Sequence, residues 1–274
     1  MNNRETWRLI LHPPYPGAWN MSIDEALLES VSAHKQPPTL RLYDWFPYAL
    51  SLGYAQTVSD INPKALKIKG WELVRRPTGG RAILHADELT YSITAPIDNP
   101  ILHGTVIESY HRISTALIGS LRLIGINAGS KLKNKNESHL SNDPACFRYP
   151  SDYEITYDDK KIIGSAQARK KDGILQHGSI PLFGEITRII EVLNYPSETA
   201  KQDARQNLAN RATTIESVLG HMVSWSQMVE AIREGFQDNL NVKFSEGNLT
   251  REELKNAQKF YQEKYNLSDW TYRI

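Results

Sequence analysis

A cysteine and a lysine are the residues of this sequence best suited to covalent chemistry. Cys146 is the single cysteine among 274 residues, and Lys161 follows it fifteen positions later. A thiol attacks as the thiolate, so its pKa of about 8.5 must fall, and a nearby ammonium group lowers it. A lone cysteine is more often a small buried apolar residue. Here the cysteine ends a polar stretch, which favours an exposed and reactive thiol.

A turn with two adjacent glycines is the second candidate site. It lies within Arg75–His85, and its residues are Pro77, Thr78, Gly79 and Gly80. Paired glycines let a ligand approach the backbone closely, and neighbouring arginines and amides can hold a phosphate or a polarised carbonyl. The same residue types also fit an ordinary tight turn with solvated arginines, which is the commoner outcome.

Several common kinds of site are not indicated. The eight histidines lack the paired spacing of zinc sites, and one cysteine cannot form a thiolate cluster. The sequence also lacks a Walker-type phosphate loop, a Gly-x-Gly-x-x-Gly run and a Gly-x-Ser-x-Gly elbow. We therefore expect no metal centre and none of the common nucleotide-binding or hydrolase sites.

Composition predicts a soluble protein of the cytoplasm. The 32 Lys and Arg residues against 31 Asp and Glu residues give a formal charge of +1, which provides no general attraction to nucleic acid or anionic lipid. No run approaches the ~18 consecutive apolar residues of a membrane span. One cysteine cannot form an internal disulfide, as suits a reducing compartment. Neither nucleic acid nor a membrane is expected as a partner.

The predicted elements that must position these two sites are strands followed by helices. This order indicates one α+β domain with a helical C-terminal part. Residues 127–145 are too polar to bury and are expected to form a mobile loop that leads to Cys146. Apolar periodicity and capping residues predict helices that begin at Asn20, at Pro63, at Val106 and at the capping boxes 213–216, 224–227 and 250–253. Alternation predicts strands over 40–42, 50–52, 71–76, 89–93, 153–157, 161–166 and 174–182.

Two segments resemble signatures of the biotin/lipoate protein ligase superfamily. The first is Arg75–His85 followed by Glu88–Ser92, and the second is Lys161–Gln167. The likeness extends from Glu5 to Tyr272 and is closest to the cysteine-dependent octanoyltransferases. It implies mixed, largely antiparallel sheets flanked by helices. It also implies one unit over residues 1–274, with a catalytic core at about 30–245 and a helical extension at about 246–274.

The resemblance also implies roles for individual residues. Cys146 would carry the acyl group as a thioester, and Lys161 would lower the pKa of its thiol. The acyl pocket would be lined on one side by Arg76, Thr78, Gly79, Gly80, Arg81 and His85, and on the other by Gly164, Ser165 and Ala166.

The same resemblance implies partners and no cofactor. The donor would be octanoyl-acyl carrier protein, and the acceptor a lysine of the glycine-cleavage H protein or of another lipoyl domain. Because acyl carrier proteins are acidic, basic groups would dock them. The candidates are Arg75, Arg76, Arg81 and residues 169–171.

Three other functions fit part of the pattern. An amidotransferase that moves octanoyl from the H protein to lipoyl domains would use the same cysteine. An ATP-dependent lipoate ligase typically has a third glycine where this chain has Arg81, lacks the nucleophilic cysteine and usually needs an accessory domain. A non-catalytic lipoyl-binding module would bury Cys146 as an inert thiol.

Overall fold

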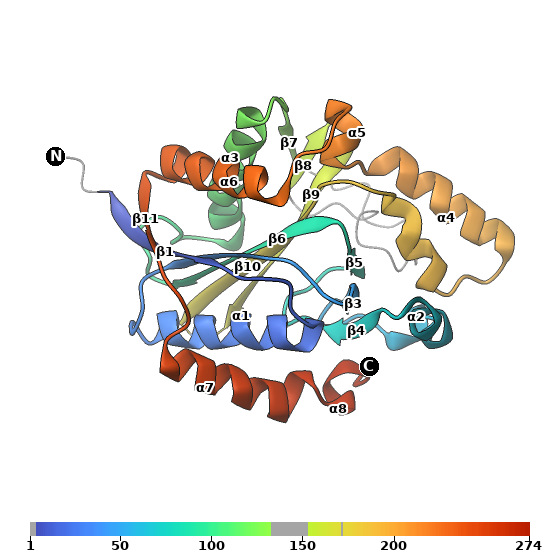
Figure 1. The fold of residues 1–274 in the computed structure, drawn as a ribbon, viewed down its shortest axis with the longest axis horizontal. Helices are drawn as coiled ribbons and strands as arrows, with labels where there is room; N and C mark the ends of the chain where they lie inside the picture. The colour runs from blue at the N-terminus through green and yellow to red at the C-terminus, as the bar shows by residue number, and fades with distance from the viewer. Residues whose placement is uncertain (1–3, 133–152, 171) are drawn as a thin grey trace.

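The computed structural model describes residues 4–132, 153–170 and 172–274, and it contains a large and a small β-sheet (Figure 1). The large sheet consists, in spatial order, of β11 (Val242–Glu246), β1 (Glu5–Leu11), β2 (Thr39–Tyr43), β6 (Glu88–Pro96), β10 (Gly173–Pro181), β9 (Lys160–Lys170), β8 (Tyr153–Tyr157) and β7 (Gly129–Leu132). The small sheet consists of β4 (Glu72–Arg75), β3 (Ala49–Leu52) and β5 (Ile83–His85).

The sheets are mixed and largely antiparallel, as the family resemblance implies. In the large sheet β1 runs parallel to both β11 and β2, and every other neighbouring pair is antiparallel. In the small sheet β3 is parallel to β4 and antiparallel to β5. The expected fold class is therefore confirmed.

Helices cover both faces of the large sheet, with α3 and α6 on one face and α1 and α7 on the other (Figure 1). The helices are α1 (Gly17–Ser32), α2 (Pro63–Lys69), α3 (Val106–Leu123), α4 (Glu198–Arg211), α5 (Ile215–Leu219), α6 (Trp225–Leu240), α7 (Arg251–Phe260) and α8 (Ser268–Thr271). Shorter turns of helix are the 3-10 segments η1 (Val58–Asp60) and η4 (Ile186–Val192) and the π-helical η5 (Tyr261–Tyr265). No helix among the described residues has both the length and the apolar composition to span a bilayer.

The two faces of the large sheet differ in chemistry. Successive strand residues point to opposite faces, so one set of side chains faces α3 and α6 and the other faces α1. The first set is apolar and forms the main core with those helices. The second set includes Arg41, Ser92 and His177, which lie in register across β2, β6 and β10 and are buried. The sheet thus presents a buried polar row to α1.

Several local predictions are confirmed. The α2 helix begins after Asn62, whose side chain caps it, and ends at Gly70, which has the left-handed φ of +68°. Capping boxes begin α6 at Ser224 and α7 at Thr250. The hairpin β8–β9 turns at Asp158 and Asp159, both with positive φ.

Three local predictions are wrong. The first helix begins at Gly17, and Asn20 lies inside it because its carboxamide accepts a hydrogen bond from buried Arg41 (2.6 Å). The cap expected at Thr213 is formed one residue later, since Thr214 accepts from the Ser217 amide. Residues 129–132 form β7 and pair with β8, so this part of the expected loop is a strand. The remainder of that loop, 133–145, lies outside the described residues.

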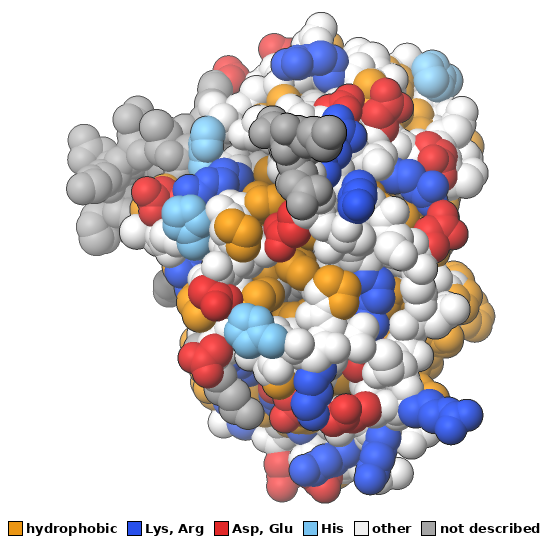
Figure 2. All heavy atoms as spheres, turned by 90° about the vertical axis from the view of Figure 1, so that its left-hand side faces the viewer, with side chains coloured by type: hydrophobic (Ala, Val, Ile, Leu, Met, Phe, Trp, Pro, Cys, Tyr) orange, Lys and Arg blue, Asp and Glu red, His pale blue; other side chains and the backbone are white. Residues whose placement is uncertain are grey.

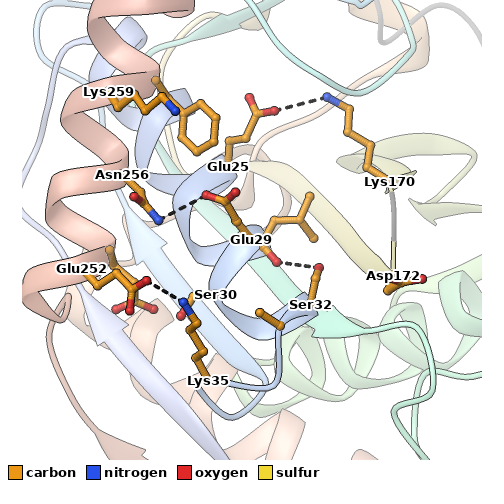
Figure 3. A pocket seen from close by; sticks show the side chains of 14 residues that line it. Glu25, Glu29, Ser30, Ser32, Lys35, Lys170, Asp172, Glu252, Asn256 and Lys259 are labelled. Atoms are coloured by element: carbon orange, nitrogen blue, oxygen red, sulfur yellow. Dashed lines mark hydrogen bonds and ion pairs between the residues drawn. The ribbon is translucent and has the colours of Figure 1, made fainter.

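A buried ion pair fastens α7 to the sheet. Arg8 on β1 donates two hydrogen bonds to the carboxylate of Glu253 (2.5 and 2.9 Å). Burial alone would raise the pKa of Glu253, but Arg8 and the Thr250 amide lower it, so the carboxylate is charged. Figure 3 shows weaker contacts nearby, from Asn256 to Glu29 (3.2 Å) and from Lys35 to Glu252 (2.6 Å). These contacts border a groove of about 660 Å³ between α1 and α7.

Replacing Glu253 by Gln should lower the free energy of unfolding by about 3 kcal/mol, because Arg8 would keep an uncompensated buried charge. Urea titration at pH 7 measures this loss. The matched control is Glu252→Gln, which removes an exposed pair and should cost at most about 1 kcal/mol. Because the pKa of Glu253 is lowered, the difference from the parent should shrink as the pH falls below about 4.5. Equal losses in both variants would contradict this assignment.

Candidate active site

A buried carboxylate on α1 organises the polar face of the sheet. Asp24 accepts hydrogen bonds from Arg41 (2.8 Å), Tyr43 (3.0 Å) and Ser92 (2.9 Å). Burial alone would raise the pKa of Asp24, but the Arg41 guanidinium and His177 lower it below its usual value. Asp24 is therefore an ionised group in the interior. Its counter-charge is the Arg41 guanidinium on β2, and hydroxyl groups on β2 and β6 donate the other hydrogen bonds.

His177 connects this carboxylate to the turn formed by residues 77–80, the glycine turn. Its Nδ1 lies 3.5 Å from Asp24 Oδ2, and its Nε2 lies 2.6 Å from the hydroxyl of Thr78. Burial lowers the pKa of His177 more than Asp24 raises it, so the ring is neutral. The proton then sits on Nδ1, facing the carboxylate, and Nε2 accepts a hydrogen bond from Thr78. The contacts from Asp24 to His177 and from His177 to Thr78 fix the side chain of Thr78.

Arg76 shapes the glycine turn from within. It is buried, and its guanidinium donates to the carbonyl oxygens of Ser51 (2.9 Å), Gly79 (2.8 Å) and Arg81 (2.7 Å). Gly80 has a φ of +93°, a conformation that favours glycine. The carbonyl groups of the turn are thus held inward by one cation.

The backbone N–H groups of two residues in the same turn are available to bind a ligand. Gly79 and Gly80 are exposed, and no described residue accepts a hydrogen bond from either amide. Two adjacent backbone N–H groups of this kind can bind a carbonyl oxygen that gains negative charge. The turn therefore presents two backbone N–H donors, and Arg76 holds the turn in place.

His85 belongs to a second buried polar cluster. Its Nδ1 contacts Glu88 (2.8 Å), its Nε2 contacts Ser51 (2.8 Å), and its ring stacks on Trp45 at 3.9 Å. Glu88 also accepts from Thr90 and from Ser179 on the neighbouring strand. Between these groups lies a cavity of about 20 Å³, which is roughly the space of one water molecule. His85, Arg76 and Ala166 all line this cavity.

Strand β9 carries the remaining predicted residues, but they do not all reach this cavity. Ala166 pairs with His177, and Gly164 pairs with Ser179. The hydroxyl of Ser165 lies on the other face of the sheet, where it accepts from Tyr91 (2.7 Å). Lys161 lies five residues from Ala166, about 17 Å along a strand.

Lys161 sits at the buried start of β9. Its side chain is 4% exposed, and its ammonium group donates to Glu154 on β8 (2.9 Å). Its carbonyl accepts from the Thr213 amide. The expected nucleophile, Cys146, lies outside the described residues.

The docking role expected of Arg75 and Arg76 is wrong. Both side chains are buried, and their guanidinium groups bind backbone carbonyls of the protein itself. Arg81 is about one-third exposed and lies 3.7 Å from Asp60. Arg169 donates to the carbonyls of Gly104 and Thr105. On the face seen in Figure 2, basic side chains are interspersed with acidic ones.

Asp24, Arg41 and His177, which support the turn through Thr78, were not among the residues predicted from the sequence. A signal for them exists, because β10 contains Gln176, His177 and Ser179 within a strand that is buried throughout. A buried strand with such polar residues requires partners that satisfy them. Among the described residues, no three His, Cys, Asp or Glu side chains are grouped as a metal site requires.

Comparisons with known proteins agree with this architecture. Residues 16–237 match the lipoyl protein ligase A/B catalytic domain family. The octanoyltransferase LipM of Brevibacillus brevis is 39% identical over 98% of this chain and 99% of its own. That of Carboxydothermus hydrogenoformans is 40% identical over 98% of this chain and 100% of its own. A bipartite lipoate protein ligase from Thermoplasma acidophilum shares the fold, with a TM-score of 0.82 at 24% identity over 98% of this chain and 96% of that one.

The protonation state of His177 can be tested by NMR of its ring nitrogens. We expect a neutral ring with the proton on Nδ1 from pH 8 down to pH 6, because burial lowers its pKa. Free imidazole in the same sample provides the reference. Thr78→Val should shift the Nε2 resonance without charging the ring, since it removes the hydroxyl donor. A ring that becomes charged together with free imidazole would contradict the assignment.

Proposed function

The chain belongs to the LipM octanoyltransferases of the lipoyl protein ligase A/B catalytic domain family, and from this premise we propose its donor, acceptor and mechanism. It is an acyltransferase that acts in lipoate biosynthesis. The proposed donor is octanoyl-acyl carrier protein, and the proposed acceptor is a lysine of the glycine-cleavage H protein. One observation carries the proposal: the exposed amides of Gly79 and Gly80 stand on a turn whose carbonyls Arg76 holds inward.

The proposed reaction has two steps. The Cys146 thiolate attacks the octanoyl thioester, forms a new thioester with the enzyme and releases the carrier thiol. The acceptor lysine, as the neutral amine, then attacks the acyl-enzyme, forms an amide, loses a proton and releases the Cys146 thiol. Thioester exchange is close to isoenergetic and amide formation is downhill. Neither step therefore needs a nucleotide.

The described residues support particular roles in these steps. In each tetrahedral intermediate, the amides of Gly79 and Gly80 would donate to the oxyanion. The acyl tail would lie along Thr78, His85 and Ala166, where each buried methylene contributes about 0.8 kcal/mol. A cavity of about 20 Å³ is too small for eight carbons, so side chains around it must move when the tail enters.

Intact mass measurement tests the acyl-enzyme directly. Incubation with octanoyl-acyl carrier protein, without ATP or acceptor, should add one octanoyl group that hydroxylamine removes. Cys146→Ala should abolish the adduct and leave the far-UV spectrum unchanged. Adding H protein should then discharge the acyl-enzyme. Octanoylation that requires ATP and free octanoate would overturn the proposal in favour of a ligase, and discharge by other lipoyl domains alone would replace the proposed acceptor.

The role of Lys161 is tested by the pH dependence of Cys146 alkylation. Lys161→Ala should raise the apparent pKa of the thiol, because an ammonium group near a thiolate stabilises it. Glu154→Gln should have the opposite effect, since it removes the carboxylate 2.9 Å from that ammonium group. Iodoacetamide rates between pH 5 and 9 give both values. Profiles identical to the parent's in both variants would remove Lys161 from the mechanism.

A further inference from the structure

The segment Trp270–Ile274 binds the turn formed by residues 53–56, which contacts the glycine turn. The link is Arg75, a buried residue at the end of β4. Its Nε and Nη2 donate to the carbonyl of Thr271 (3.0 and 2.8 Å). Its Nη1 donates to the carbonyls of Gly53 (2.8 Å) and Gln56 (2.6 Å). One guanidinium thus joins Thr271 to the turn 53–56.

Side chains of the segment add further contacts, to Arg75 and to the same turn. The indole N–H of Trp270 donates to the carbonyl of Arg75 (2.8 Å). Arg273 donates to the carbonyl of Tyr54 (2.7 Å), and its guanidinium lies 3.8 Å from the centre of the Tyr54 ring and 4.4 Å from that of Trp270. The cation therefore contacts two aromatic rings that meet edge to face, and both contacts stabilise it.

The turn 53–56 in turn supports the glycine turn. The amide of Tyr54 donates to the carbonyl of Thr78 (2.8 Å). Gly53 packs so closely that a Cβ atom placed on it would lie 1.8 Å from the carbonyl oxygen of Gly80. A displacement of the turn 53–56 must therefore move Thr78 and Gly80 as well.

Because Arg75 is charged and buried, the support that residues 53–56 give to the glycine turn depends on the segment Trp270–Ile274. Among the described residues the partners of the Arg75 guanidinium are backbone carbonyls and no carboxylate, and burial and the nearby Arg273 lower its pKa. A buried guanidinium without a carboxylate requires its hydrogen bonds, and two of them end on Thr271. Lys264 and Tyr265, just before the segment, both bind Glu25 on α1 and so fix its start.

We propose that Trp270–Ile274 is a positioning element for acyl transfer, which holds the turn 53–56 and through it sets the amides of Gly79 and Gly80 at the acyl carbonyl. This inference rests on the proposed function. The residues of the segment touch neither substrate nor reacting atoms. They act through Arg75 and Tyr54 on the donors of the glycine turn.

Substitutions at Arg273 test the proposal. Arg273→Ala should lower kcat for octanoyl transfer about tenfold and leave KM for octanoyl-acyl carrier protein within about twofold, because misplaced donors weaken the transition state and not the binding of the donor protein. Arg273→Lys should restore most of kcat, since an ammonium group can donate to Tyr54 and lie on the same rings. Tyr272→Ala is the matched control, because that side chain is exposed within the same segment. Thermal midpoints verify that all three variants are folded at the assay temperature.

Hydrogen exchange measures the support without any substrate. The amide of Tyr54, which donates to the carbonyl of Thr78, should exchange faster in Arg273→Ala than in the parent, and at the parent's rate in Arg273→Lys and Tyr272→Ala. Unchanged exchange and unchanged kcat in Arg273→Ala would overturn the inference, as would an increase in KM alone. If the parent forms no octanoyl adduct, the proposed function fails, and the exchange experiment still decides whether the segment holds the turn.

Discussion

The negative charge of Asp24, buried between α1 and the large sheet, is the constraint on which the rest of the site depends. An ionised carboxylate in the interior is stable only with close counter-charges and hydrogen bonds. Arg41, Tyr43 and Ser92 supply them from β2 and β6, and these bonds fix α1 relative to the two strands. The same carboxylate orients His177 beneath Thr78.

Arginines near the site are structural ligands of the backbone. Arg75 donates to carbonyls of the turn 53–56 and of Thr271, and Arg76 donates to carbonyls of Ser51, Gly79 and Arg81. Arg41 binds the carbonyl and side chain of Asn20. Because these guanidinium groups occupy the acceptors of the turns, the donors are what remains exposed. A site that stabilises a developing oxyanion needs such an excess of donors. The cations therefore determine which backbone groups of the turn stay exposed.

Helix caps and tight turns could be predicted from the sequence, because they depend on a few adjacent residues. The cap at Asn62, the left-handed Gly70 and the turn at Asp158 and Asp159 all appear where the residue types predict them. Asn20 was misplaced because its side chain serves Arg41, a partner 21 residues away that no local rule reveals.

The candidate site was predictable to a similar extent. Paired glycines indicated a turn open to a ligand, but Asp24 has a residue type that is usually exposed, and its sequence neighbours give no sign that it is buried. Its role depends on strand register, which brings Arg41, Ser92 and His177 into one row. The reactivity of Cys146 and the part played by Lys161 remain predictions. The structure gives Lys161 a carboxylate partner, Glu154, that the sequence did not suggest.

The parallel pairing of β1 with β11 bears on the order in which the chain folds. Residues 5–9 find their partners only at 242–246, and Arg75 finds Thr271 across 196 positions. Contacts between segments so distant in sequence form late, because the loop between them must close first. A nascent chain therefore exposes an unpaired edge of β1 and an unsatisfied arginine until nearly all of this sequence has been synthesised. The support that Arg75 gives to the turn 53–56 is therefore completed in one of the last steps of folding.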